Sequence, residues 1–241
     1  MIRRKEVFNV IGAVALACLV SSSAHAIPIT TSGVWDNPQG SAAVLATVTG
    51  EDTNEIGWGV PADGSQSSYE FNGLTDSEVD LDDALAGELF PLGEFVHNNF
   101  PITTFQFLGA DLTVNILVDL DGDNIDDIDV DFGPFEFDHN ETPNAEPCDP
   151  AGSPPCPDVV SIPTAFEGIP FTFMGMNFEF FLAGFRESAT DPIIPEFITD
   201  ENAENIATLF AGVRKVPEPM TPLLLGLGLL GLGVIRKRKK E

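Results

Sequence analysis

The chain has 241 residues, of which 38 are Asp or Glu and 11 are Lys or Arg, so its formal net charge is −27. A protein this acidic is not expected to bind nucleic acid or anionic lipid, because both ligands need Lys and Arg to replace their counterions. Hydrophobic residues make up 43% of the sequence, which excludes a wholly disordered chain and predicts a sizeable core.

The first 26 residues have the three parts of a secretory signal peptide. Residues 3–5 (RRK) form a positive start, and residues 10–20 (VIGAVALACLV) form an apolar stretch that is too short to span a bilayer. Residues 24–26 (AHA) then form a small-x-small cleavage site. We therefore expect cleavage between Ala26 and Ile27.

Export determines how the three cysteines are interpreted, because exported proteins fold in an oxidising compartment. Cys18 lies in the apolar stretch and leaves with the signal peptide; lipidation of Cys18 is the alternative, although the residues before it fit a lipobox poorly. Cys148 and Cys156 bracket a Pro-rich loop (CDPAGSPPC) and are predicted to form a disulfide. A metal site is the less favoured alternative there, since no His or further Cys accompanies the pair.

Residues 27–215 form an acidic body that holds 35 of the acidic and three of the basic residues, a net charge of −32. Such a body should be soluble and attract cations. Turn residues separate short runs rich in β-branched and aromatic residues, which predicts a mainly β domain, a β-sandwich or jelly roll. The expected strands are residues 43–49, 67–71, 94–97, 103–108, 112–120, 128–132, 171–181 and 206–213.

Local features refine this β prediction. Residues 109–111 (GAD), between the fourth and fifth of these runs, predict a hairpin. Apolar residues of the fifth run alternate between positions 114 and 118 and should share one face. Residues 77–89 (SEVDLDDALAGEL) are the best short helix candidate, with Ser77 as the N-cap. Residues 141–157 are predicted to be a Pro-rich loop.

Asp residues are densest between positions 119 and 131, where seven carboxylates fall within thirteen residues. Calcium prefers six to eight oxygen ligands, and closely spaced Asp residues around a Gly turn can supply them. The spacing is not that of an EF-hand, because no Glu closes a twelve-residue loop. We therefore consider Ca²⁺ a candidate cofactor, with a charged hairpin that has one solvated face as the alternative. The candidate calcium ligands are Asp119, Asp121, Asp123, Asp126 and Asp127.

The sequence offers few candidate catalytic residues. It contains no nucleophile elbow, no H-E-x-x-H zinc motif and no P-loop. Glu136 and Asp138 would share one strand face, so a surface glycan hydrolase that uses this pair is the alternative to a non-enzymatic protein. His97 is predicted to form hydrogen bonds in a loop, and Trp35 and Trp58 to be core residues rather than platforms for sugars.

Residues 216–241 form a tail with three parts. Val216-Pro217-Glu218-Pro219 comes first, and its prolines prevent a helix from beginning earlier. An apolar, Gly-rich stretch follows, with a predicted transmembrane segment at about residues 220–235. Residues 236–240 (RKRKK) should stay in the cytoplasm while the acidic body lies outside. A buried core helix is the alternative for the apolar stretch, and the basic flank argues against it.

This order of motifs is similar to the PEP-CTERM sorting signal of exopolysaccharide-producing Gram-negative bacteria. The resemblance implies that an exosortase, a membrane cysteine protease-transpeptidase, recognises Pro217, Glu218 and Pro219 and processes the tail. It implies a precursor anchored in the inner membrane, whose body is then released or transferred to the cell surface or the extracellular polysaccharide matrix. Exosortase and the membrane are then the expected partners, polysaccharide is a candidate partner, and nucleic acid is not expected.

The body contains a second set of recognisable segments, which are residues 32–35 (SGVW), 56–61 (IGWGVP), 66–71 (QSSYEF) and 93–102 (GEFVHNNFPI). Together they resemble the choice-of-anchor K domain, including its subgroup named for a Thr-His-x-Asn motif. His97 and Asn99 fit that motif, whereas Val96 replaces its Thr. The resemblance spans about residues 30–215 and implies a surface protein with no assigned enzyme activity. The expected function is that of a non-enzymatic, exosortase-sorted protein that binds calcium or glycan.

Overall fold

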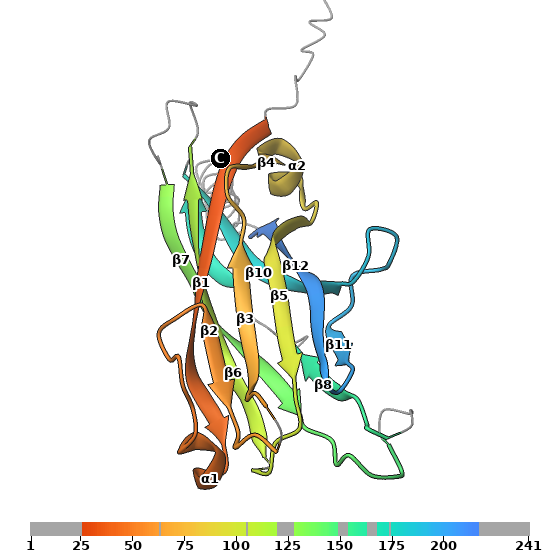
Figure 1. Cartoon of the computed structure of the whole chain (residues 1–241). Helices are drawn as coiled ribbons and strands as arrows, with labels where there is room; N and C mark the ends of the chain where they lie inside the picture. The colour runs from red at the N-terminus through yellow and green to blue at the C-terminus, as the bar shows by residue number, and fades with distance from the viewer. Residues whose placement is uncertain are drawn as a thin grey trace, which may run out of the picture.

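The computed structural model describes residues 26–216, except for residues 63, 105, 120–127, 149–153, 163–167 and 174. Two curled six-stranded sheets pack face to face over this range, and all the strand pairings between named strands are antiparallel (Figure 1). The prediction of a mainly β body is therefore confirmed.

Each sheet combines strands from distant parts of the sequence. The first sheet has the order β11-β8-β7-β6-β1-β4, and the second has the order β2-β3-β5-β12-β10-β9. The strands of the first sheet are β1 (Ala26–Gly40), β4 (Ser77–Asp80), β6 (Phe107–Val118), β7 (Ile128–Asn140), β8 (Asp158–Ser161) and β11 (Glu196–Thr199). Those of the second are β2 (Glu55–Trp58), β3 (Ser67–Gly73), β5 (Phe90–Asn99), β9 (Ile169–Phe173), β10 (Met176–Arg186) and β12 (Ala203–Lys215). Two short helices, α1 (Ala42–Leu45) and α2 (Leu81–Ala86), complete the described fold.

An aromatic core fills the space between the sheets. Along β7, Phe135 and Phe137 are buried whereas Glu136 and Asp138 are exposed, because successive strand residues point to opposite faces. The expected alternation in β6 is also present, with every second residue from 110 to 116 buried. A shift of one residue in register would expose this whole apolar set, so the burial pattern itself specifies the register.

Two strand predictions and one hairpin prediction are wrong, wholly or in part, where local contacts override β propensity. Residues 43–49 contain α1 instead of a strand, because Ser41 caps that helix by accepting a hydrogen bond from Val44 N. In the segment 103–108, β6 begins only at Phe107, since Thr103 N donates to Val60 O at 2.8 Å instead of joining a sheet. The hairpin expected at residues 109–111 is absent, and β6 runs straight through this segment.

Two other predictions are correct in part. Residues 171–181 belong to two strands, β9 and β10, and Gly175 adopts a positive φ of 75° in the turn between them. The helix predicted at 77–89 begins later, as α2, and its N-cap is Asp80 rather than Ser77, which belongs to β4. The loop predicted at residues 141–157 is present in its described part and connects β7 to β8.

The sequence prediction missed β1, although this strand lies between β4 and β6. Its inward positions include Thr31 and Gly33 beside Ile27, Ile29 and Trp35, so the apolar alternation is weak. Within residues 26–216 as described, no helix has the length and hydropathy to cross a membrane. The predicted transmembrane segment at about residues 220–235 lies outside the described part of the chain, as does the signal peptide up to residue 25.

Candidate functional site

A cluster of buried polar side chains lies between the two sheets. His97 comes from β5 in one sheet, whereas His139 and Asp158 come from β7 and β8 in the other. One possible ligand atom from each of the three lies within 4.8 Å of the other two, and all three residues are buried. Strand alternation explains this convergence, because His97 shares the inward face of β5 with Phe95, and His139 shares that of β7 with Phe137.

Hydroxyl groups occupy one nitrogen of each imidazole. His139 Nδ1 lies 2.6 Å from the hydroxyl oxygen of Tyr69, and His97 Nδ1 lies 2.9 Å from Thr199 Oγ1. The other nitrogen of His97, Nε2, is buried without a hydrogen-bond partner. His139 Nε2 lies 3.9 Å from Asp158 Oδ2. The second nitrogen of His97 is therefore left for an additional interaction, whereas that of His139 also lies within hydrogen-bond distance of Glu141.

Two carboxylates lie beside His139, and a third, Glu201, lies close to them. Glu141 Oε2 lies 3.2 Å from His139 Nε2. Asp158 Oδ1 accepts hydrogen bonds from the backbone N–H and the hydroxyl group of Thr142, at 2.7 and 3.1 Å, whereas its Oδ2 has no hydrogen-bond partner. Glu201 Oε2 is likewise buried without one. In the described part of the chain, no Lys or Arg forms an ion pair with any of these three carboxylates.

Burial controls the protonation of the cluster. Burial holds the pKa of His97 well below its usual value, and the neighbouring His139 adds to this effect, so the His97 imidazole stays neutral. Burial and the charge of Glu141 raise the pKa of Asp158 to about 6, although His139 and Thr142 oppose the shift. Burial and then the charge of Asp158 raise the pKa of Glu201 to about 7. The neutral His97 imidazole thus shares the cluster with carboxyl groups that resist ionisation.

We expect Glu201 to reduce the stability of the metal-free protein, obtained by treatment with a chelator, as the pH rises from about 4.5 to 7. Its pKa in the fold, about 7, exceeds the ordinary value of 4.5, so the fold favours the protonated carboxyl. This penalty is absent below about pH 4.5, where the group is protonated in both states, and complete above about pH 7. Asp158 and Glu141, whose charges also face Glu201, act in the same direction. Melting temperatures of Glu201→Gln between pH 4.5 and 8 should therefore vary less than those of the wild type.

The matched control for this experiment is Glu204→Gln, an exposed residue on neighbouring β12. Both substitutions remove one carboxylate from the acidic body, so both reduce its general self-repulsion equally. Only Glu201→Gln should flatten the pH profile. Parallel profiles for the two variants would contradict the assignment of this pH dependence to the buried site.

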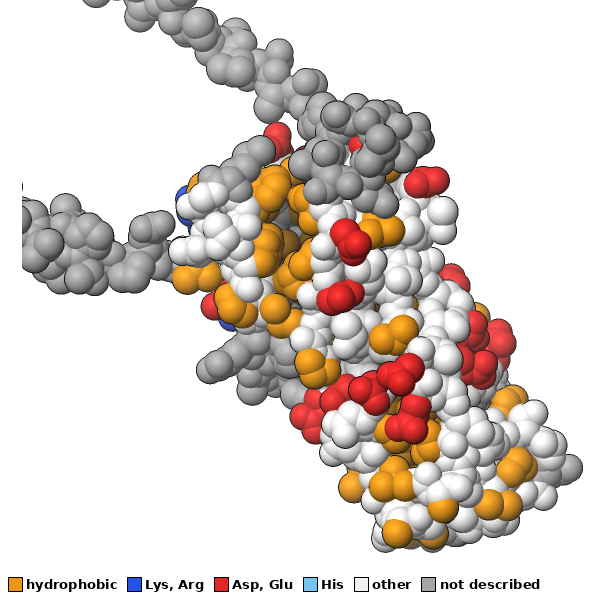
Figure 2. Space-filling view, turned by 90° about the vertical axis from the view of Figure 1, so that its left-hand side faces the viewer, with side chains coloured by type: hydrophobic (Ala, Val, Ile, Leu, Met, Phe, Trp, Pro, Cys, Tyr) orange, Lys and Arg blue, Asp and Glu red, His pale blue; other side chains and the backbone are white. Residues whose placement is uncertain are grey.

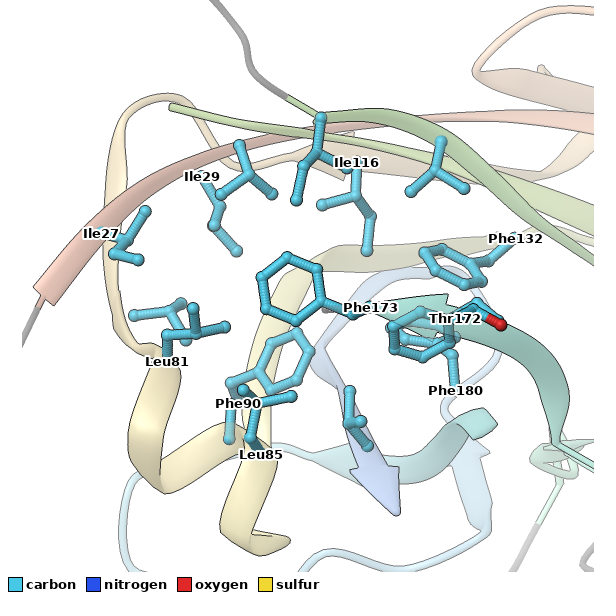
Figure 3. A pocket seen from close by; sticks show the side chains of 17 residues that line it. Ile27, Ile29, Leu81, Leu85, Phe90, Ile116, Phe132, Thr172, Phe173 and Phe180 are labelled. Atoms are coloured by element: carbon cyan, nitrogen blue, oxygen red, sulfur yellow. The ribbon is translucent and has the colours of Figure 1, made fainter. Parts of the chain in front are cut away.

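An apolar cavity of about 280 Å³ lies between the sheets at another place along the sandwich. The polar cluster is near the start of β12, where Asn205 pairs with His97, whereas the cavity includes Val213 near the end of that strand. Figure 3 shows side chains such as Ile27, Phe90 and Phe173 arranged around the cavity. In the space-filling view, hydrophobic side chains gather around a recess, and Asp and Glu side chains form separate groups on the same face (Figure 2).

The lining of this cavity limits its chemistry. Among the described lining residues, Thr172 supplies the only hydroxyl group, which donates a hydrogen bond to Asn177 Oδ1 at 3.0 Å. The described lining contains no titratable or nucleophilic side chain. The cavity can therefore hold a hydrocarbon group, but it lacks the few placed polar groups that orient a ligand in most binding sites.

The structure describes only part of the predicted calcium site. Asp119 is buried directly after β6. Asp121, Asp123, Asp126 and Asp127 lie outside the described residues, so calcium binding there stays a prediction.

The neighbouring carboxylates fit the charged-hairpin alternative. Asp129 and Asp131 are exposed on one face of β7 and accept hydrogen bonds from Asn115 Nδ2, at 2.8 and 2.9 Å. A polar residue on β6 thus bridges them, as expected for the solvated face of a strand pair.

The carboxylate pair of the hydrolase alternative lies on the outer face of β7. Glu136 and Asp138 are both exposed, and Glu136 accepts a hydrogen bond from Gln39 Nε2 at 3.4 Å. Partial burial and the charge of Glu136 raise the pKa of Asp138. Neither residue belongs to the polar cluster or lines the apolar cavity. Trp35 and Trp58 are fully buried, which confirms that they are core residues.

The predicted disulfide between Cys148 and Cys156 is confirmed, with Cα atoms 5.3 Å apart. It lies in the loop that leads from His139 to Asp158. The hydroxyl oxygen of Thr142, at the start of this loop, also lies 2.9 Å from Pro157 O, so its one proton is shared between Pro157 O and Asp158 Oδ1. The disulfide and these hydrogen bonds restrain the segment that positions Asp158.

The structure describes the predicted cleavage junction at one end of the body but not the Pro-Glu-Pro residues at the other. Ala26 and Ile27, the predicted cleavage junction, lie at the start of β1, where Ala26 is exposed and Ile27 is buried. Pro217, Glu218 and Pro219 lie outside the described residues and follow soon after Lys215, the last residue of β12.

The sequence prediction missed the polar cluster. The sequence predicted His97 in a loop, but it lies on β5 and is fully buried. Neither His139 nor Asp158 was identified as a site residue. The available signal was the alternation of each His with inward-facing Phe residues, which places both imidazoles in the core.

Comparison with known families identifies the tail. Residues 215–239 match the PEP-CTERM protein-sorting motif. This match confirms the predicted sorting signal and indicates an exported protein that exosortase processes at the membrane. A search of curated proteins finds no match to the chain.

Proposed function

We propose that this chain is a non-enzymatic exported protein, which an exosortase processes and delivers to the cell surface or the extracellular polysaccharide matrix. The PEP-CTERM motif at residues 215–239 carries this proposal. Lys215 is the last residue of β12 and pairs with Phe178 of β10. The matched motif therefore begins at the last residue of the final strand, and its Pro-Glu-Pro residues come after the sheet in the chain, so processing of the tail does not require the sheet to open.

The charge distribution supports this arrangement across a membrane. Residues 236–240 are all basic, as expected of a cytoplasmic flank, whereas the body from residue 27 to 215 has a net charge of −32. Figure 2 shows several groups of acidic side chains and very few basic ones on one face of the body. Such a surface keeps the body soluble and separated from anionic lipid after export.

The biochemical role that we propose for the body is binding rather than catalysis. The exposed position of Glu136 and Asp138 on an outer sheet face supports this choice, because glycoside hydrolysis needs two carboxylates placed around a bound sugar. Calcium binding by the Asp-rich segment, glycan binding and membership of the choice-of-anchor K group stay predictions.

The sorting proposal predicts that a Pro217→Ala/Pro219→Ala double variant accumulates as unprocessed precursor. Loss of both prolines removes the backbone restriction that the processing enzyme is expected to recognise, while leaving the apolar stretch and its basic flank unchanged. The full chain should be expressed in a Gram-negative host that has an exosortase. Immunoblots of inner-membrane, surface and medium fractions should then show the double variant almost entirely in the inner membrane.

Pro222→Ala is the matched control, because it changes a proline of the same tail outside the Pro-Glu-Pro motif. This control should be processed like the wild type. Normal processing and release of the double variant would overturn the proposed sorting function.

A further inference from the structure

We propose that His97, His139, Asp158 and Glu141 together bind one Zn²⁺ ion, which links the two sheets of the body. This site is independent of the sorting tail and of the predicted calcium segment. The proposed function in sorting does not involve this site.

The first argument is the concentration of unsatisfied polar atoms at one place. In the described part of the chain, seven buried side-chain nitrogen or oxygen atoms have no hydrogen-bond partner. Two of them, His97 Nε2 and Asp158 Oδ2, belong to the proposed ligands, and Glu201 Oε2 and Asn99 Oδ1 are close neighbours in the same cluster. Buried polar groups are nearly always satisfied, so such a set indicates a missing ion or water.

The second argument is the geometry of the donor atoms. Zinc bonds of about 2.0–2.2 Å place tetrahedral ligand atoms roughly 3.3–3.6 Å apart. His139 Nε2 lies 3.2 Å from Glu141 Oε2 and 3.9 Å from Asp158 Oδ2, close to that spacing. The candidate atoms of His97, His139 and Asp158 lie within 4.8 Å of one another, so side-chain rotation has to bring the widest pair closer by no more than about 1.5 Å.

The third argument is that the groups around these ligands already orient them. Metal-bound imidazoles usually engage their second nitrogen in a hydrogen bond, which selects the ring orientation. Tyr69 does this for His139, and Thr199 does it for His97. Thr142 holds Asp158 Oδ1 with two hydrogen bonds and leaves Oδ2 available.

The fourth argument is charge. Buried carboxylates without a cationic partner are costly, and the described body contains only three Lys or Arg residues. Arg214 pairs with Glu179, Arg186 lies over the ring of Phe210, and Lys215 Nζ contacts a Met sulfur. None of them neutralises the cluster. A divalent cation between neutral imidazoles, Asp158 and Glu141 would leave the buried site without net charge.

The donor set favours Zn²⁺ over Ca²⁺. Calcium takes oxygen ligands, whereas paired imidazole nitrogens with carboxylates suit zinc. Four protein ligands would complete a tetrahedral shell, which is typical of a structural site rather than a catalytic one. The ligands come from β5 in one sheet and from β7 and the strand and loop after it in the other, so the ion would stabilise the sandwich.

The test uses the full-length chain, purified in detergent with an affinity tag that contains neither His nor Cys. After treatment with chelator, the protein should rebind about one Zn²⁺ per chain in the presence of excess Ca²⁺, which occupies the acidic surface. Zinc should raise the melting temperature, and chelator should reverse the rise. X-ray absorption of the zinc-loaded wild type should show two imidazole ligands.

Asp158→Asn and His139→Gln should each weaken Zn²⁺ binding by at least about 100-fold in competition with a chromophoric chelator. Asp138→Asn is the matched control, because this exposed residue precedes His139 on the same strand and points outward. If the ligand variants fail to fold, the stoichiometry and the imidazole count of the wild type decide the question. Wild-type protein without tightly bound zinc, a site with oxygen ligands only, or equal affinity in ligand and control variants would overturn the proposal.

Discussion

Replacing Trp58 with Ala is expected to lower the free energy of unfolding by about 3–5 kcal/mol, the usual cost of removing a large aromatic side chain from a core. Trp58 is fully buried and stacks on Phe107, with ring centroids 3.9 Å apart. It also packs against Tyr69 at 4.7 Å and His97 at 5.7 Å, so it fills the space beside the polar cluster. Its loss would leave a cavity at the junction of core and cluster. Denaturant unfolding followed by circular dichroism measures the change without depending on Trp fluorescence.

Leu108→Ala provides the control for this experiment, because Leu108 follows Phe107 on β6 but is 56% exposed. This surface truncation should change the unfolding free energy by no more than about 0.5 kcal/mol. Comparable losses in the two variants would contradict the view that the aromatic cluster around Trp58 is the central part of the core.

The second large effect is expected for Gly109→Ala, with a loss of about 2–6 kcal/mol from backbone strain and overpacking combined. Gly109 has a φ of 141° and pairs with Asp138 across β6 and β7. A Cβ atom at this position would overlap the carbonyl oxygen of Phe137, which belongs to the rigid sheet backbone. The two strands would have to separate where Phe137 enters the core. Thermal and denaturant unfolding of the purified variant measure this cost.

Gly87→Ala separates the two contributions to this loss. Gly87 also has a positive φ, 104°, at the C-cap of α2, but among the described residues no heavy atom beyond Gly87 and its two chain neighbours lies within 4 Å of the position that a Cβ would occupy. The control should therefore lose only about 1–2 kcal/mol, the cost of the left-handed backbone conformation. If both variants lose the same amount, the close approach of β6 and β7 at Gly109 does not constrain the fold.

The two features of the body have different consequences for an exported protein. The apolar cavity is lined by hydrocarbon and has little means of selecting a ligand. The polar cluster, in contrast, joins both sheets and is flanked by the loop that the disulfide of Cys148 and Cys156 closes. Covalent and proposed metal cross-links therefore restrain neighbouring parts of the same loop, which suits an exported protein.

Several features of this protein could be read from the sequence because they depend on residues close together in the chain. The sorting tail is defined by the order of a proline motif, an apolar stretch and a basic end, and the family match confirms it. The disulfide follows from two cysteines that bracket a short loop, and the β class follows from alternating apolar residues. Each of these signals is local, so no knowledge of the sheet order was needed.

Strand boundaries were less predictable because neighbouring segments compete for the same backbone groups. Residues 109–111 have the composition of a turn, yet Gly109 lies inside β6. Glycine is needed there because the carbonyl oxygen of Phe137 occupies the place that a Cβ atom would take. β1 was missed because small and polar residues occupy some of its inward positions, where the other sheet approaches closely. Gly33, for example, faces the ring of Phe71.

By itself, the sequence determined the sorting signal at the C-terminus, the disulfide and the mainly β character of the body. Only the tertiary structure brought His97, His139 and Asp158 together. Alternation along a strand shows which face a residue occupies, so both His side chains could have been placed in the core from sequence. It does not show which strands lie opposite each other, because that depends on how two sheets built from distant segments pack.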